Sequence, residues 1–131
     1  MVNNRLEDNI LLYLKKKYNY LTDIYKTTKN LETASLEDET AFSSLLSTRQ
    51  DTMNNIDKID KQIKSSIALL PTGAKEKIQN VLQSKNVQIK PDNTFQSNIF
   101  DIAKQNKTLL KNIIETDKKV NAKLKKLKNN K

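Results

Sequence analysis

The fold is decided by residues 95–127, FQSNIFDIAKQNKTLLKNIIETDKKVNAKLKKL, which contain neither glycine nor proline. Apolar residues recur there in three- and four-residue steps, as they do on one face of an α-helix. One seam repeats every seven residues: Ile99, Asn106, Ile113, Val120 and Leu127. The second seam contains Phe95, Ile102, Leu109 and Thr116, and it is widened by Leu110 and Leu124. The stretch predicts a helix over 93–128, on the order of 50 Å long, capped by Asp92 or Asn93.

The same periodicity occurs twice earlier in the chain and predicts long helices over 5–33 and 36–70. The sequence Ser35-Leu36-Glu37-Asp38 is similar to a capping box and should open the second helix. Pro71-Thr72-Gly73, with the only glycine of the chain, should end it. The sequence predicts a short helix over residues 74–84 and an extended connector over residues 87–89.

Together these elements predict an all-α fold in a single domain over residues 1–131. Three long helices and one short helix, joined by short connections, should form an elongated up-and-down antiparallel bundle. Their apolar seams should pack at shallow angles, as in coiled coils.

The composition excludes most enzyme classes. The 131 residues include one Gly, two Pro, no Cys and no His, which argues against β-sandwiches, Gly-rich phosphate loops, zinc sites on Cys or His, and Ser-His-Asp triads. Asp57 and Asp60 share a helix face, but a di-metal bundle site also needs His. We expect these acids to pair with Lys58, Lys61 and Lys64, and we expect no catalysis, cofactor or metal.

The formal charge of +9 is concentrated at one end. Residues 118–131 carry seven lysines and no acid, whereas the rest has 17 basic and 15 acidic side chains, a net charge of +2. A basic end of this kind suits nucleic acid or an anionic membrane, or is simply a solvated helix end. We expect no specific nucleic-acid binding. The N-terminal residues do not resemble a secretory signal, which favours a cytoplasmic protein.

Arg49 is one of two arginines and lies on the apolar seam between Leu46 and Met53. A guanidinium in that position needs an acidic partner. Asp117, on the seam side of the last helix, is the predicted partner, and Asp60 is a second candidate. An incoming ligand is the alternative.

Residues 45–60, LLSTRQDTMNNIDKID, carry two leucines, an Arg-Gln pair and an Ile-Asp-Lys-Ile-Asp ending after an acidic start. This run resembles the second helix of FliT-type flagellar export chaperones. Residues 113–120, IIETDKKV, are similar to part of the family's last helix. The related FlgN group is similar in outline but fits the Arg-Gln segment less well.

The resemblance implies a small, cytoplasmic, non-enzymatic helical protein. It would bind the C-terminal region of a late type III export substrate and deliver it to the export machinery. The filament cap protein is the cargo expected for the FliT type, with hook–filament junction proteins as the alternative.

We place the cargo contacts on the last helix, and expect residues 113–127 to be held less firmly than the rest. The candidate contact residues are Leu109, Leu110, Ile113, Val120, Leu124 and Leu127. A helical nucleic-acid- or membrane-binding protein acting through its basic end is the main alternative function. A secreted or structural coiled-coil protein is a third interpretation, and a homodimer is also left open.

Overall fold

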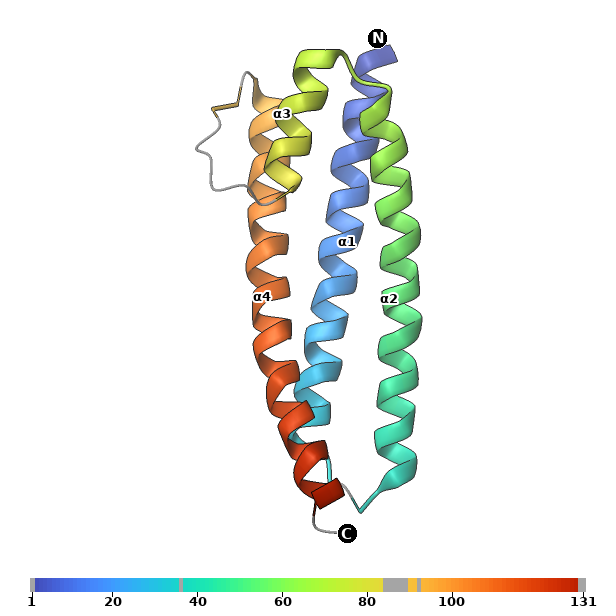
Figure 1. Ribbon diagram of the computed structural model, residues 1–131. Helices are drawn as coiled ribbons and strands as arrows, with labels where there is room; N and C mark the ends of the chain where they lie inside the picture. The colour runs from blue at the N-terminus through green and yellow to red at the C-terminus, as the bar shows by residue number, and fades with distance from the viewer. Residues whose placement is uncertain (1, 36, 84–89, 92, 130–131) are drawn as a thin grey trace.

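The computed structural model describes residues 2–35, 37–83, 90–91 and 93–129 (Figure 1). Its elements are the helices α1 (Val2–Thr33), α2 (Glu39–Ala68), α3 (Thr72–Leu82) and α4 (Thr94–Asn129). The described ranges contain helices and turns and no β-strand. The prediction of an all-α bundle with three long helices and one short helix is confirmed. The connector expected at 87–89 lies outside the described residues.

The second helix begins three residues later than expected. Asp38 is its N-cap, and the Asp38 carboxylate accepts a hydrogen bond from the backbone N–H of Ala41 at 3.0 Å. Ser35 does not open the helix, because its hydroxyl instead accepts the N–H of Glu37 within the turn. At the start of α4, Asn93 accepts the N–H of Gln96 at 2.8 Å, so one of the two expected caps is present.

Helix α1 lies between α2 and α4 (Figure 1). It packs along both of them, whereas no Cα atom of α2 comes within 8 Å of one in α4 among the described residues. Helix α2 runs antiparallel to α1. Helix α4 runs parallel to α1, because α1, α3 and α4 all begin at the same end of the bundle. The short α3 packs against α2 and α4 at that end only.

The buried residues form three clusters along the bundle. The cluster beside α3 is the largest, and includes Ile10, Leu14, Ile63, Ile67, Ile78 and Ile99. In the middle cluster Leu21, Ile24 and Ile113 are buried, with Tyr25, Ile56 and Leu109 packed beside them. The far cluster is built on Leu31, Phe42 and Val120. The core is therefore most extensive beside α3, and each of the other two clusters has three buried residues.

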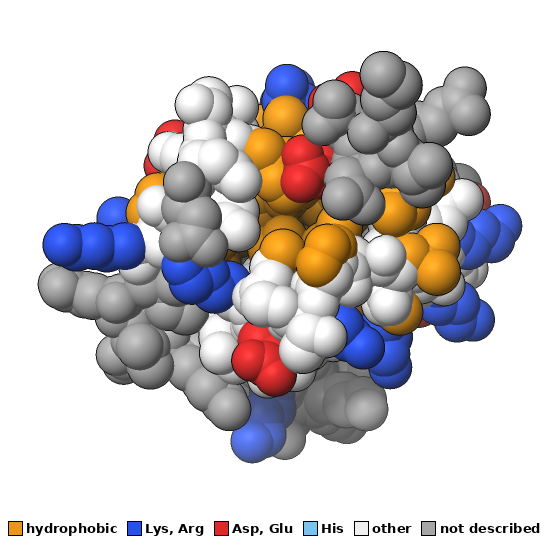
Figure 2. Space-filling model, turned by 90° about the horizontal axis from the view of Figure 1, so that it is seen from above, with side chains coloured by type: hydrophobic (Ala, Val, Ile, Leu, Met, Phe, Trp, Pro, Cys, Tyr) orange, Lys and Arg blue, Asp and Glu red, His pale blue; other side chains and the backbone are white. Residues whose placement is uncertain are grey.

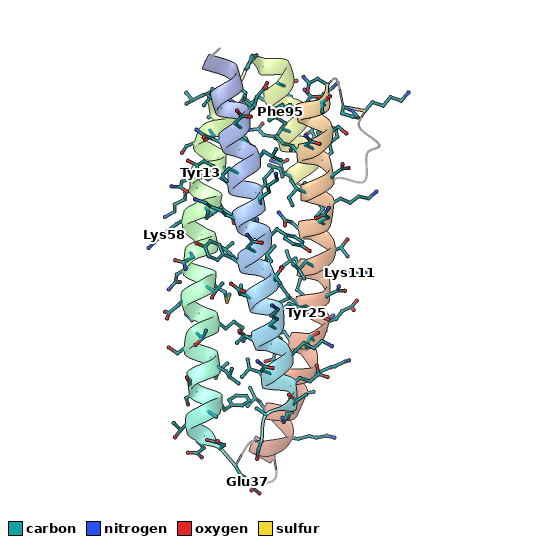
Figure 3. All side chains as sticks on the ribbon, turned by 180° about the vertical axis from the view of Figure 1, so that it is seen from behind. Tyr13, Tyr25, Glu37, Lys58, Phe95 and Lys111 are labelled. Carbon is teal, nitrogen blue, oxygen red and sulfur yellow. The ribbon has the colours of Figure 1, made fainter. Side chains whose placement is uncertain are left out.

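Two further views show the ends of the bundle. Figure 2 looks onto the end where α1, α3 and α4 begin, and shows hydrophobic side chains gathered near the centre of this end with Lys and Arg side chains around its edge. Figure 3 shows Phe95 near that end and Glu37 at the opposite one, in the turn before α2. In the described part of the chain, none of the helices has an apolar stretch long enough to cross a bilayer.

The distal part of α4 is docked against α1. Val120 is 1% exposed and packs with Leu31 and Phe42. The Lys123 ammonium donates hydrogen bonds to the carbonyl oxygens of Glu32 (3.0 Å) and Ala34, which lie at the C-terminal end of α1. The structure thus packs α4 against the end of α1 as far as Lys123, and the expectation that residues 113–127 are held less firmly than the rest stays a prediction for hydrogen exchange.

We predict that Val120→Ala lowers the free energy of unfolding by about 1–3 kcal/mol, because it leaves a cavity between three helices. The control is Lys125→Ala, an exposed change on the same helix, which should alter it by about 0.5 kcal/mol or less. Urea denaturation followed by circular dichroism measures both. If the two variants have equal free energies of unfolding, α4 does not pack against α1 at Val120 in solution.

Candidate functional site

A groove runs between α2 and α4 beyond the end of α3. It exists because the backbones of these two helices stay apart, with no Cα pair within 8 Å among the described residues, and α3 covers only part of the interval between them. The hollow measures about 380 Å³. Its inner surface is formed by apolar side chains of three helices: Leu21, Ile24, Ile56 and Ile113. We call this hollow the α2–α4 groove.

The rims of the α2–α4 groove are also apolar. Met53 on α2 is 43% exposed, and Leu110 and Ile114 on α4 are 45% and 49% exposed. These are three of the five large hydrophobic side chains that are exposed to this extent among the described residues. Their concentration around a single groove is typical of a site that binds another protein.

An ion pair crosses the groove at the end away from α3. Arg49 on α2 donates to Asp117 on α4, with 2.6 Å between Nη1 and Oδ1, and the same Nη1 lies 3.5 Å from the hydroxyl of Thr28 on α1. The Arg49 and Asp117 side chains are 19% and 34% exposed. The Arg49–Asp117 pair expected from the sequence is thus present, and it joins two helices whose Cα atoms nowhere come within 8 Å of each other among the described residues.

A second ion pair marks the end of the groove next to α3. Lys17 of α1 lies 2.8 Å from Asp60 of α2, measured from Nζ to Oδ1. Asp60 therefore pairs across to the neighbouring helix. It is neither the partner of Arg49 nor the partner of a lysine on its own helix, as the sequence interpretation had it, because its side chain turns toward α1.

The expected cargo contacts fall into different environments. Leu110 lies on the groove rim, and Ile113 lies at the bottom with 7% exposure. Leu109 and Leu124 are partly buried in the middle and far clusters, and Val120 is core. The side chain of Leu127 lies outside the described residues.

Two rim residues were not singled out from the sequence. Ile114 directly follows the seam residue Ile113, and Met53 continues the seam of Arg49. The signal available in the sequence was an apolar residue next to a heptad position. That signal does not show whether another helix of the bundle covers the residue.

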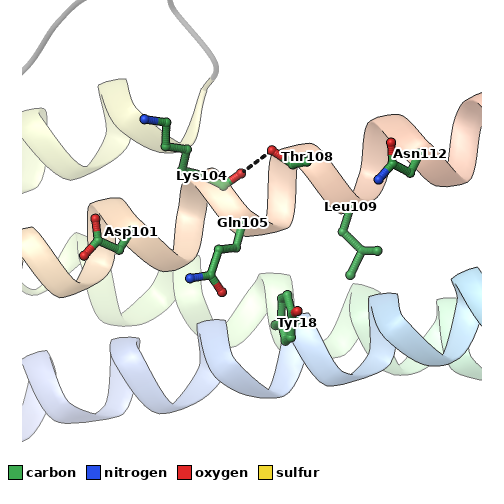
Figure 4. Close-up of a pocket in the computed structure, with 7 residues that line it drawn as sticks. All are labelled: Tyr18, Asp101, Lys104, Gln105, Thr108, Leu109 and Asn112. Atoms are coloured by element: carbon green, nitrogen blue, oxygen red, sulfur yellow. Dashed lines mark hydrogen bonds between the residues drawn. The ribbon is translucent and has the colours of Figure 1, made fainter.

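A second hollow, of about 550 Å³, lies on another side of α4 (Figure 4). It is lined by Tyr18 of α1 and by six residues of α4: Asp101, Lys104, Gln105, Thr108, Leu109 and Asn112. The hydrogen bond drawn there, from the Thr108 hydroxyl to the Lys104 carbonyl, lies within the helix. Tyr18 and Leu109 are the two apolar residues among the seven that line it, whereas most residues lining the α2–α4 groove are apolar, so that groove is the better candidate for binding a protein.

The polar groups of the groove are arranged for structure and recognition. Among the described residues, no cluster of three acidic side chains could hold a metal ion. The charged side chains at the two ends of the groove are paired with one another across helices. The arrangement offers an apolar surface bounded by two ion pairs, which suits an amphipathic partner.

We predict that Arg49→Met destabilises the protein by about 1–3 kcal/mol, because it leaves Asp117 half-buried without its partner. The double variant Arg49→Met/Asp117→Leu should recover most of this loss. Lys17→Met, which breaks the more exposed pair, should cost about 1 kcal/mol or less. Thermal and urea unfolding provide the comparison. If Arg49→Met leaves stability unchanged while partner binding is lost, Arg49 is a recognition residue rather than a structural one.

Comparison of the chain with protein-family models, with curated proteins and with solved structures returned no match.

Proposed function

We propose that this protein is a non-enzymatic chaperone that binds an amphipathic helix of another protein in the α2–α4 groove. The observation that carries the proposal is the apolar groove left open beyond α3, with Met53, Leu110 and Ile114 exposed on its rims. A fourth long helix would cover these side chains in a complete bundle. A partner helix would take that place.

The shape of the groove favours a helix as the occupant. Helix α3 already lies between α2 and α4 at one end of the same interval, so a helix is known to fit there. From Arg49 to Asp60 the groove follows α2 over 11 residue-to-residue steps, about 16 Å or three helical turns. A segment of that length presents apolar anchors at positions i, i+3, i+4 and i+7.

The resemblance to FliT-type chaperones identifies the partner in this proposal. The occupant is the C-terminal helical region of a late flagellar export substrate, with the filament cap protein first and the hook–filament junction proteins second. Covering an amphipathic segment keeps an unassembled substrate from aggregating before export. Ordering the segment on binding costs about 2–5 kcal/mol, so affinity would be moderate, as cargo release to the export machinery in the cytoplasm requires.

The basic end of α4 gives less support to nucleic-acid or membrane binding. Lys123 is engaged with backbone carbonyls at the end of α1, and Lys119 lies 4.0 Å from the Glu32 carboxylate. At least two of the lysines at this end therefore face protein groups. Specific recognition of a nucleic acid would need a surface shaped to bind it. The α2–α4 groove is a better-defined binding surface than the basic end of α4.

We predict that Ile114→Asp weakens binding of the filament cap protein's C-terminal segment by at least tenfold, equivalent to about 1.4 kcal/mol. A carboxylate on the rim would be desolvated against apolar side chains. The matched control is Leu12→Asp, because Leu12 is also 49% exposed but lies on the face of α1 away from the groove. Isothermal titration calorimetry on the full chain measures both.

Three outcomes would contradict the proposal. The first is equal affinity of the Ile114 and Leu12 variants for the segment. The second is tight, salt-sensitive binding of duplex DNA or anionic vesicles in place of the segment. The third is a stable dimer in light scattering that Ile114→Asp dissociates, because a second copy would then occupy the groove.

A further inference from the structure

The α2–α4 groove continues along α2 into a smaller hollow between α2 and α3. This hollow measures about 240 Å³ and shares Lys17 and Asp60 with the groove. Its inner surface includes Ile63 and Ile67 of α2, which are both buried. Polar side chains of α2 and α3 line it as well: Lys64, Gln79 and Gln83. We call it the α2–α3 hollow. A helix that follows α2 one turn past Asp60 therefore enters it.

Two charged side chains along this path are not neutralised by a neighbour. Asp57 lines the groove and Lys64 lines the α2–α3 hollow, and both are exposed. Neither forms an ion pair or a hydrogen bond with another described residue, whereas the other charged side chains that line the two hollows are paired across helices. The pairing of Asp57 with Lys58, Lys61 or Lys64 expected from the sequence is therefore not formed, because an exposed pair gains little over hydration.

The two unpaired charges have opposite signs and lie on the same side of α2. They are seven residues apart in the sequence. Seven residues are close to two helical turns, so the two positions share a face and are on the order of 10 Å apart along the axis. A second helix lying alongside α2 has the same geometry, and can therefore meet both charges with two residues of its own that are seven positions apart.

Apolar contacts alone do not fix how a helix lies in the groove. A helix that slides by one turn, or that lies in the opposite direction, still buries apolar side chains, because the hydrophobic effect is not directional. Charged groups across an interface do fix the register, since a wrong alignment brings like charges together. Asp57 and Lys64 are placed to do this along the rim of α2.

We infer that the partner helix carries a basic and an acidic residue seven positions apart, and that these pair with Asp57 and Lys64 respectively. The inference rests on the proposed function, because it concerns the helix that occupies the α2–α4 groove. A helix in the reverse direction would place its acid at Asp57 and its base at Lys64, so both contacts would be repulsive. The two charges thus set direction and register, while the apolar rims supply affinity.

The surroundings of Lys64 favour an acidic group there. Gln79 and Gln83 line the same hollow from α3, and their amide N–H groups can donate to a carboxylate that approaches the Lys64 ammonium. The remaining two charges of the hollow, on Lys17 and Asp60, neutralise each other at 2.8 Å. The unbalanced charge of the α2–α3 hollow is therefore positive.

The experiment exchanges the two charges on the protein, in the double variant Asp57→Lys/Lys64→Glu. Calorimetry on the full chain uses the filament cap protein's C-terminal segment as the probe. Both positions are exposed and the net charge is unchanged, so this variant should unfold at nearly the native temperature. It should bind the probe at least tenfold more weakly at about 0.15 M salt, and the loss should shrink in about 1 M salt, because exposed charges are then screened.

The matched control is the double variant Asp51→Lys/Lys58→Glu. Asp51 and Lys58 are also exposed, and they are also seven residues apart on α2. Neither lines the groove or the α2–α3 hollow. The control therefore makes the same exchange of charges on the same helix, outside the path of the partner. It should bind the probe as the native protein does.

A reciprocal exchange in the probe completes the test. Each basic–acidic pair of the probe that is seven residues apart is exchanged in turn. One exchanged probe should bind the native protein at least tenfold more weakly. The same exchanged probe should bind Asp57→Lys/Lys64→Glu more tightly than the unaltered probe does, because both contacts become attractive again.

The outcomes separate this inference from the proposed function. If Asp57→Lys/Lys64→Glu binds the probe normally while Ile114→Asp does not, the groove is the binding site and the charge contacts are wrong. If the Asp57/Lys64 and Asp51/Lys58 exchanges weaken binding equally, or if no exchanged probe restores it, the inference is also wrong. If the native protein does not bind the probe at all, the proposed function fails and the inference fails with it.

Discussion

The structure depends on a mismatch of helix lengths. Helix α3 has 11 residues and α2 has 30, so α3 extends about 16 Å beside a helix of about 45 Å. One short helix therefore completes the bundle at one end only. The remaining interval between α2 and α4 is covered by no other described helix, which leaves Met53, Leu110 and Ile114 exposed. The α2–α4 groove exists because α3 is too short to cover the whole interval between α2 and α4.

Polar contacts hold the helices at the spacing that keeps this groove open. Arg49 and Asp117 join α2 to α4 where these helices have no backbone contact, and Lys17 with Asp60 joins α1 to α2 at the other end. Lys123 holds α4 to the end of α1 through backbone carbonyls. An entirely apolar interval would favour closure of α2 onto α4, because burial of apolar area is not directional. The Arg49–Asp117 pair fixes the distance between α2 and α4 at one end of the groove.

Much of the fold could be predicted from the seven-residue repeat through Ile99, Ile113 and Val120, which identifies the buried face of α4. The position of Arg49 on an apolar seam also predicted its pair with Asp117. The groove itself could not be predicted, because periodicity shows that a face is apolar but not which helix covers it. Whether Ile114 is core or rim depends on the distance between α2 and α4. Ser35 and Asp38 are both residue types that cap helices, so the sequence alone did not show that Asp38 is the N-cap of α2.

The central claim is that a partner helix lies between α2 and α4 beyond α3. It is tested most directly by methyl NMR of the full chain labelled at Ile, Leu and Met, titrated with the filament cap protein's C-terminal segment. The account predicts large shift changes for Met53, Leu110 and Ile114, and intermolecular contacts from the segment to these methyl groups, with Leu12 and Leu69 unaffected. Shift changes confined to residues near the basic end of α4, such as Leu124, with the groove methyl groups unchanged, would contradict it.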